Sequence, residues 1–124
     1  MSIQPFIRCS DITVSLPFYT EVLDFNILQA PDSDPTSFMS MYAFLERDGD
    51  RVHLSQHAGD GVYGNVIYIN VTNLDEVYKR FTNNGLTVKD KAGITMQPVE
   101  QTWAMKEFSV ADPDGNRLTF GQNL

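Results

Sequence analysis

Cysteine is almost absent from this sequence, because Cys9 is the only one in 124 residues. A single thiol excludes an internal disulfide and any metal site built on several cysteines. Long apolar runs are missing too, since no segment approaches the roughly 20 apolar residues that a membrane-spanning helix needs. The N-terminal stretch MSIQPFIRCS lacks the basic and then apolar layout of a signal peptide. These absences predict a cytoplasmic protein with no membrane partner.

Basic residues are also scarce. Nine lysines and arginines stand against sixteen acidic residues, which gives a formal net charge of −7. Such a charge repels phosphate backbones, so we expect no nucleic-acid partner. It would weakly attract a cationic small molecule, although acidic surfaces often serve solubility alone.

The sequence contains an internal repeat. The stretch DGDRVHLSQ, residues 48–56, matches DGNRLTFGQ, residues 114–122, at an offset of 66. The stretch QPFIRCSDI, residues 4–12, matches VIYINVTNL, residues 66–74, at an offset of 62. The increase of the offset from 62 to 66 indicates about four extra residues in the second half, near KAGITMQPVEQ. We therefore expect residues 1–124 to form one domain of two repeats, about 1–60 and about 62–124.

Each repeat predicts the same order of elements. In the first, a strand over 6–9 precedes a helix capped by Asp11 or Thr13, and Pro17 requires that helix to begin close before it. In the second, Asn73 caps a helix that ends at Asn84 and Gly85. Alternation then predicts strands over 25–29, 38–46 and 51–56, and over 87–89, 104–111 and 117–122. The predicted fold class is α+β, with two β-α-β-β-β units that share a core.

Three stretches carry a resemblance to a known family: FYTEVLDF (18–25), WAMKEF (103–108) and EFSVADPDGNRLTF (107–120). With the paired units, they make the chain resemble the glyoxalase/bleomycin resistance protein/dioxygenase superfamily, also called vicinal oxygen chelate proteins. The stretch that begins at Trp103 is most similar to the bleomycin-resistance branch. This resemblance implies a curled mixed sheet, a cup that holds a ligand, and a homodimer. Asp24 stands where the family has glycine, and aspartate tolerates left-handed backbone geometry.

Metal-dependent members of this family hold a divalent ion at four positions on the first and last strands of the two units. The repeat places these positions at Gln4, His53, Val66 and Thr119. Val66 has no donor atom and Thr119 offers a neutral hydroxyl, so the quartet lacks the usual carboxylate. We therefore expect no cofactor, no bound metal and no catalytic residue. His57 would lie about 13 Å from His53 along a strand, too far to share an ion.

Strand alternation separates two faces of the predicted sheet. The core face, under the helices, would contain Ile7, Cys9, Tyr42, Phe44, Ile69, Val71, Phe108, Val110, Leu118 and Phe120. The opposite face, here called the cup face, would contain Gln4, Phe6, Arg8, Met39, Met41, His53, Ser55, Tyr68, Asn70, Met105, Glu107, Ser109 and Thr119. Aromatic and methionine side chains mixed with a few polar groups are typical of a pocket for a flat, partly apolar ligand. A dimer interface would have the same composition.

The predicted ligand-binding residues come from this face and its rim: Trp103, Phe38, Met39, Met41, His53, Tyr68, Met105 and Glu107. Trp103 is the only tryptophan, and the sequence leaves a stacking role and a core role equally open. Glu107 is the one acid of the cup face. We expect it to pair with Arg8 or Lys106, in preference to holding a cationic ligand group or moving a proton.

Two functions from different classes follow. The first is a metal-independent protein that sequesters a small molecule, such as a bleomycin-like antibiotic, in the clefts of a homodimer. The second is a metal-dependent lyase, isomerase or dioxygenase with a rearranged site, in which Glu107 completes the shell around Gln4 and His53. The incomplete quartet favours the first. A third function is an unrelated metabolite-binding or assembly role.

Overall fold

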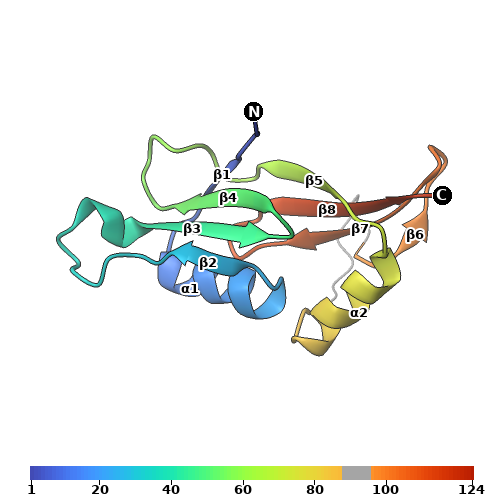
Figure 1. Ribbon diagram of the computed structural model, residues 1–124, viewed down its shortest axis with the longest axis horizontal. Helices are drawn as coiled ribbons and strands as arrows, with labels where there is room; N and C mark the ends of the chain where they lie inside the picture. Colours follow the sequence, from blue (N-terminus) through green and yellow to red (C-terminus); the bar gives the residue numbers. More distant parts are fainter. Residues whose placement is uncertain (88–95) are drawn as a thin grey trace.

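Two four-stranded sheets with helices on one side make up the computed structural model, which describes residues 1–87 and 96–124 (Figure 1). The first half contains β1 (Phe6–Arg8), α1 (Ile12–Pro17), the π-helical turn η1 (Phe18–Val22), β2 (Asn26–Gln29), the 3₁₀ helix η2 (Phe38–Met41), β3 (Tyr42–Arg47) and β4 (Asp50–Ser55). The second half contains β5 (Val66–Asn70), α2 (Leu74–Asn83), β6 (Val99–Glu100), β7 (Met105–Ala111) and β8 (Arg117–Asn123).

The two sheets have equivalent strand orders, β1-β4-β3-β2 and β5-β8-β7-β6. In each sheet, the first strand of that half of the chain is parallel to the last one, and all other neighbouring strands are antiparallel. The predicted α+β class with mixed sheets is therefore confirmed. Within residues 1–87 and 96–124, no helix has the length and hydrophobicity of a membrane span.

The register of the strands matches the repeat in the sequence. Phe6 lies opposite His53 in the parallel pair β1/β4. Tyr68 lies opposite Thr119 in the pair β5/β8. These two pairs are related by the offsets of 62 and 66 that the sequence shows. The equivalence of His53 and Thr119 is thus a feature of the sheets as well as of the sequence.

The glutamine that ends each repeated stretch, Gln56 or Gln122, caps the helix of its own half. The amide of Ile12 at the start of α1 donates to Oε1 of Gln56 at 3.0 Å. The amide of Leu74 at the start of α2 donates to Oε1 of Gln122 at 2.8 Å. The first amides of a helix have no partner within it, so these side chains satisfy groups that would otherwise be unpaired.

The predicted cap of the first helix is confirmed at Asp11, whose side chain accepts a hydrogen bond of 3.0 Å from the amide of Thr13. The helix begins at Ile12 and not close before Pro17, which lies inside it. Because Pro17 has no amide hydrogen, it cannot continue the hydrogen-bond pattern. The chain instead widens into η1, where Leu23 N donates to the carbonyl of Phe18 at 3.2 Å. The requirement that the helix begin close before Pro17 is wrong, because the π-helical turn accommodates a proline that a regular helix would not.

The side chains of β3 lie on the opposite faces of the sheet from those that the sequence predicted. The predicted strand over 38–46 is interrupted, because η2 occupies Phe38–Met41 and β3 follows it. A helical turn does not keep the two-residue period, so the alternation restarts one residue out of phase. Ala43 and Leu45 are fully buried, whereas Tyr42 and Phe44 are half-buried on the cup face. The predicted core positions of Tyr42 and Phe44 are therefore wrong.

The later strands agree more closely with the sequence. β7 and β8 lie within a residue of the predicted strands over 104–111 and 117–122. The predicted strand over 87–89 extends into residues that the structure does not describe. β6 was not predicted, because it is only two residues long, and it pairs with β7 through Val99 opposite Glu107.

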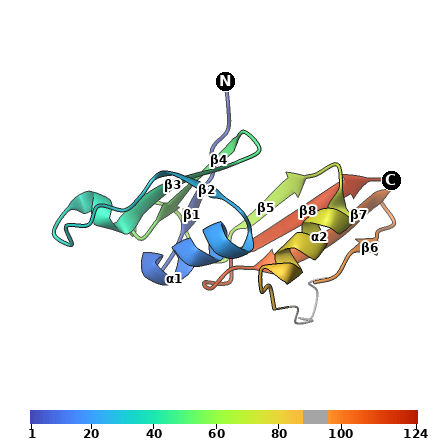
Figure 2. The ribbon, with the colours of Figure 1, turned by 60° about the horizontal axis from the view of Figure 1, so that its bottom comes forward.

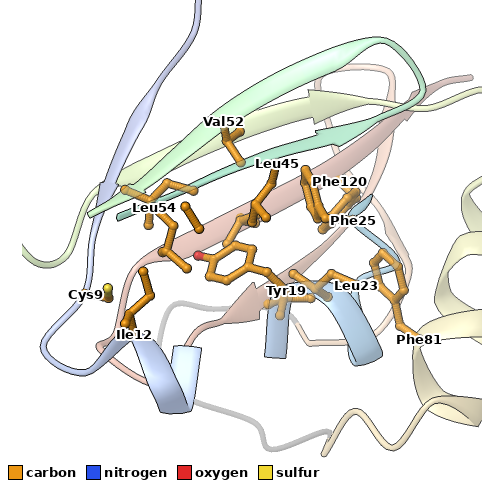
Figure 3. Close-up of a cluster of buried hydrophobic side chains, with 14 of the residues drawn as sticks. Cys9, Ile12, Tyr19, Leu23, Phe25, Leu45, Val52, Leu54, Phe81 and Phe120 are labelled. Carbon is orange, nitrogen blue, oxygen red and sulfur yellow. The ribbon is translucent and has the colours of Figure 1, made fainter. Parts of the chain in front are cut away.

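Both halves contribute to one core between the sheets and the helices (Figures 2 and 3). Tyr19 and Leu23 of the first half belong to the same buried cluster as Phe81 of α2 and Phe120 of β8, all labelled in Figure 3. Phe120 stacks on Phe108, with ring centroids 5.2 Å apart, and Phe81 meets both rings edge-on. The helices therefore cover one face of the sheets, which leaves the cup face on the other side.

Each hairpin turn contacts the helical segment of the other half. Asp112, before the β7–β8 turn, accepts a hydrogen bond of 2.6 Å from the hydroxyl of Tyr19 in η1. Arg47, before the β3–β4 turn, places its guanidinium over the ring of Phe81 in α2, 5.1 Å from the centroid. Tyr19 and Phe81 are again separated by the offset of 62. Asp24, in left-handed geometry with φ of 60°, adds an ion pair with Arg80 of α2.

Candidate functional site: a cleft on the second sheet

The cup face of the second sheet contains a cleft of about 400 Å³, here called the Trp103 cleft. It is lined by Val66, Tyr68, Gln101, Trp103, Glu107, Phe108, Ser109, Arg117 and Thr119. β5, β7 and β8 position most of these side chains, and Gln101 and Trp103 come from the connection between β6 and β7. Three of the predicted ligand-binding residues, Trp103, Tyr68 and Glu107, therefore lie together.

Glu107 is the buried centre of this cleft. Its side chain accepts a hydrogen bond of 2.6 Å from the hydroxyl of Tyr68 and one of 3.1 Å from the indole Nε1 of Trp103. Both bonds go to the same oxygen, Oε2. A carboxylate can accept about four hydrogen bonds, so Oε1 keeps its capacity for a further donor.

Glu107 does not form the ion pair that the sequence favoured. Lys106 pairs with Asp75 of α2 at 3.0 Å, because neighbouring residues on a strand point to opposite faces. The guanidinium of Arg8 lies over the ring of Tyr63, 4.4 Å from its centroid. The predicted pairing is therefore wrong, and the donors to Glu107 within the described residues are both neutral.

The hydroxyl of Tyr68 reaches Glu107 across β8. A Cβ added to Gly121 would overlap this hydroxyl, so the glycine leaves the space in which the tyrosine ring lies. Desolvation raises the pKa of Tyr68 to about 12, and the hydrogen bond to Glu107 and its negative charge act in the same direction. Tyr68 consequently stays protonated and donates to Glu107 at neutral pH.

Trp103 is not a core residue, because 59% of it is exposed. The residue after it, Ala104, has a φ of 62°, a conformation that an alanine rarely adopts. This turn is held by a hydrogen bond of 2.7 Å from the amide of Gln101 to the carbonyl of Met105. The strained turn and the bond to Glu107 hold a large aromatic surface at the rim of the cleft.

The rest of the cleft floor is polar. The hydroxyls of Ser109 and Thr119 are hydrogen-bonded to each other at 2.9 Å. Arg117 lies two residues before Thr119 on β8, and its Nε is buried without a hydrogen-bond partner in the described part of the chain. The sequence interpretation did not include Arg117, although the alternation that assigned Thr119 to the cup face also assigns Arg117 to it.

On the first sheet, the equivalent position is filled by an aromatic stack. The ring of His53 lies between those of Phe6 and Phe44, with centroids 4.2 and 4.5 Å away. Its Nε2 donates to Oε1 of Gln4 at 2.9 Å, and its Nδ1 accepts from the hydroxyl of Tyr42 at 2.5 Å. Desolvation lowers the pKa of His53, and the charge of Asp60 only partly opposes this.

The four positions of the predicted quartet do not fit a divalent metal. Gln4 and His53 use their donor atoms on each other, Val66 has none, and Thr119 is bonded to Ser109. No carboxylate from Asp or Glu lies among these four, and no group of three or more His, Cys, Asp or Glu side chains among residues 1–87 and 96–124 is arranged around a common point. Hard and borderline cations need several convergent donors, which this set does not provide.

The remaining predicted residues lie away from the Trp103 cleft. Phe38, Met39 and Met41 are on η2, at the opposite end of the molecule from the β6–β7 connection (Figure 1). Phe38 is 72% exposed and stacks on His57, with centroids 3.9 Å apart. Met105 is on the same face of β7 as Glu107 but does not line the cleft. Within one chain, the predicted ligand-binding residues therefore lie in separate regions: some line the Trp103 cleft and the others lie outside it.

A larger groove of about 580 Å³ runs along the free edge of β5. It lies between the N-terminal residues Ile3 and Pro5, the β3–β4 turn and β5, and it shares Val66 and Tyr68 with the Trp103 cleft. Neither Trp103 nor Glu107 lines this groove. We therefore assign the candidate site to the smaller cleft, where an aromatic surface and a buried carboxylate converge.

These features define an α+β protein of two equivalent halves with a ligand-sized cleft on the face of its sheets opposite the helices. The model of the Glyoxalase/Bleomycin resistance protein/Dioxygenase superfamily matches residues 3–120, and the chain belongs to this family. The resemblance predicted from the sequence is therefore confirmed. A search of curated proteins finds no match.

Several solved structures share the fold over nearly their whole length. A bleomycin-binding protein crystallised with bleomycin is 20% identical, with a TM-score of 0.76 and coverage of 100% of this chain and 99% of that one. TioX from Micromonospora sp. ML1 is 18% identical, with a TM-score of 0.74 and the same coverage. A bleomycin resistance determinant encoded on transposon Tn5 is 20% identical, with a TM-score of 0.73 and coverage of 99% and 98%. At these identities the similarity establishes the fold.

Proposed function

We propose that this protein binds a small molecule in the Trp103 cleft without a metal and acts by sequestering it. The observation that carries the proposal is the exposed indole of Trp103, held by a hydrogen bond over the buried carboxylate of Glu107. A fixed aromatic surface stacks on a flat ligand at little cost in conformational entropy. The cleft volume of about 400 Å³ lies in the range usual for small-molecule sites.

A bleomycin-like antibiotic is the first ligand to test. Two proteins with the same fold are described as a bleomycin-binding protein and a bleomycin resistance determinant. The net charge of −7 and the carboxylate of Glu107 are both compatible with a cationic ligand.

We also propose that the protein forms a homodimer through the cup face. Phe6, Val66, Tyr68 and Trp103 are 41%, 52%, 46% and 59% exposed on this side of the molecule. Large apolar side chains gathered on one surface are typical of an interface. A second copy would cover them and close the open side of the cleft. Light scattering should give a mass twice that of one chain, and a monomer at micromolar concentration would contradict this.

Trp103 provides the direct test of ligand binding. As the only tryptophan, its emission reports on the cleft alone. Titration with metal-free bleomycin should change the emission in a saturable way, and calorimetry should give one site per chain. Trp103→Phe should weaken binding about tenfold, because a smaller ring stacks less well. Val14→Ala, at an exposed position of α1 on the helix side, is the control and should bind normally. Absence of any heat or emission change would refute bleomycin as the ligand.

Elemental analysis separates this function from the enzyme alternative. The protein purified without chelator should contain no stoichiometric divalent metal, since the quartet around His53 lacks a fitting donor set. Iron, zinc, manganese or nickel near one per chain, lost in His53→Ala, would support the metal-dependent enzyme instead.

A further inference from the structure

The Trp103 cleft contains two opposite charges that do not neutralise each other. Glu107 on β7 pairs in register with Gly121, which is four residues from Arg117 along β8. Four residues of strand correspond to about 13 Å. The three ion pairs within residues 1–87 and 96–124 involve neither Glu107 nor Arg117. The cleft therefore has a negative end and a positive end.

Within the described part of the chain, each of these charges lacks a partner of opposite sign. Glu107 is 9% exposed, and among residues 1–87 and 96–124 its carboxylate receives hydrogen bonds only from the neutral groups of Tyr68 and Trp103. Arg117 is half-buried, and its buried Nε has no acceptor among the described residues. Burying a charge without a partner is costly, so both groups are stabilised when a ligand supplies the missing partner.

The surface between the two charges fits a ligand rather than an internal contact. The paired hydroxyls of Ser109 and Thr119 form its floor, while Tyr68 and Trp103 form an aromatic wall. We infer that the cleft takes a dipolar ligand, whose cationic group binds Glu107 and whose anionic group, a carboxylate or a similar oxyanion, binds Arg117. This inference rests on the proposed binding function of the cleft and specifies the chemical class of its ligand.

A tripeptide with blocked and free ends tests the inference directly. Gly-Phe-Gly has an ammonium and a carboxylate about 10 Å apart when extended, with an aromatic ring between them. Its N-acetylated, C-amidated and doubly blocked forms remove the positive, the negative or both charges. By calorimetry and Trp103 emission, the free peptide should bind about tenfold more tightly than either singly blocked form, because each end loses a charge-assisted hydrogen bond.

Variants assign each end of the peptide to one residue. In Glu107→Gln, a free amine on the peptide should no longer tighten binding, whereas a free carboxylate should still do so. Arg117→Gln should have the opposite effect, and Arg117→Lys should retain part of the affinity because it keeps the charge. This crossed pattern cannot arise from a folding defect, which would weaken all four peptides together. Near-ultraviolet circular dichroism confirms that each variant is folded.

The outcomes separate this inference from the proposed function. Equal binding of the four peptides, or no binding of any, overturns the dipolar ligand. If one folded variant loses the tighter binding conferred by the free amine and also that conferred by the free carboxylate, the assignment of the ammonium to Glu107 and the carboxylate to Arg117 is overturned. In each case the bleomycin titration decides independently whether the cleft sequesters a small molecule.

Discussion

At the scale of single residues, His53 acquires its properties entirely from its neighbours. The two nitrogens are used by Gln4 and Tyr42, and the ring is enclosed between Phe6 and Phe44. The bond to Gln4 requires a hydrogen on Nε2, and the bond from Tyr42 requires a lone pair on Nδ1. The surroundings therefore favour the neutral imidazole, which agrees with its lowered pKa.

This environment predicts a pH dependence of stability. The folded protein binds the His53 proton less readily than the unfolded chain, whose pKa is near 6.5. The stabilisation is therefore complete above that pH and decreases as the pH falls through 6.5 towards the lowered pKa. Urea unfolding at about pH 7.5 and about pH 5 should show a smaller pH-dependent loss in His53→Gln than in the parent protein. His57 and all carboxylates are common to both proteins, so an equal loss in the two would contradict the assignment.

At the scale of elements, the two glutamine caps explain why the repeated stretches end in the same residue. Gln56 follows β4 and Gln122 lies near the end of β8, and each accepts a hydrogen bond from the first amide of the helix in its own half. The sequence revealed the repeat, but nothing in the periodicity indicated that a side chain so distant from the helix would cap it. That contact depends on the parallel pairing of the first and last strands of each half.

Removal of either cap should destabilise the protein. Gln56→Ala and Gln122→Ala each leave a helix amide without its partner, and we expect a loss of about 1 kcal/mol in the free energy of unfolding. Gln56→Glu and Gln122→Glu are matched controls, since they keep the oxygen and place a negative charge at a helix N-terminus. Urea denaturation measures the difference. Alanine variants as stable as the parent would show that water replaces the glutamines.

The elements that were predicted correctly are those with uninterrupted patterns. β7 and β8 alternate without a break between clear turn residues, so their faces could be predicted, and with them the positions of Glu107, Ser109 and Thr119 in the cleft. β3 could not be predicted in the same way, because the 3₁₀ turn before it shifts the period and exchanges the two faces. Pro17 gave a wrong expectation only for where the first helix begins, because the π-helical turn after it accommodates a proline that a regular helix would not.

At the scale of the whole molecule, the halves are held together by equivalent contacts from each hairpin to the opposite helical segment. The bond between Tyr19 and Asp112 is the buried polar member of this pair. Burial raises the pKa of Tyr19 strongly, and the charge of Asp112 adds to it, so the hydroxyl keeps its proton. Asp112 also accepts bonds from the amides of Asp114 and Asn116, which shape the turn.

Tyr19→Phe tests this junction. The change removes one donor from a buried carboxylate, and we expect a loss of about 1–3 kcal/mol in the free energy of unfolding. Tyr63→Phe, at a position 46% exposed, removes a hydroxyl without affecting the junction and should alter stability by less than about 0.5 kcal/mol. Trp103 emission and far-ultraviolet circular dichroism should follow the same urea transition in both variants. Separate transitions would indicate halves that unfold independently.

The sequence alone determined the properties that depend on local pattern: the repeat, the α+β class, the family, and the presence of Tyr68 and Glu107 on one face of the sheet. Only the tertiary structure decided which hydrogen-bond and ion-pair partners those side chains have. Glu107 has neutral donors instead of a salt bridge, because Lys106 points to the other face and pairs with α2. His53 is enclosed by aromatic rings, and Arg117 shares the cleft with Glu107 without reaching it. Periodicity assigns a residue to a face, whereas its partners depend on the separation and direction of strands that only the folded sheets bring together.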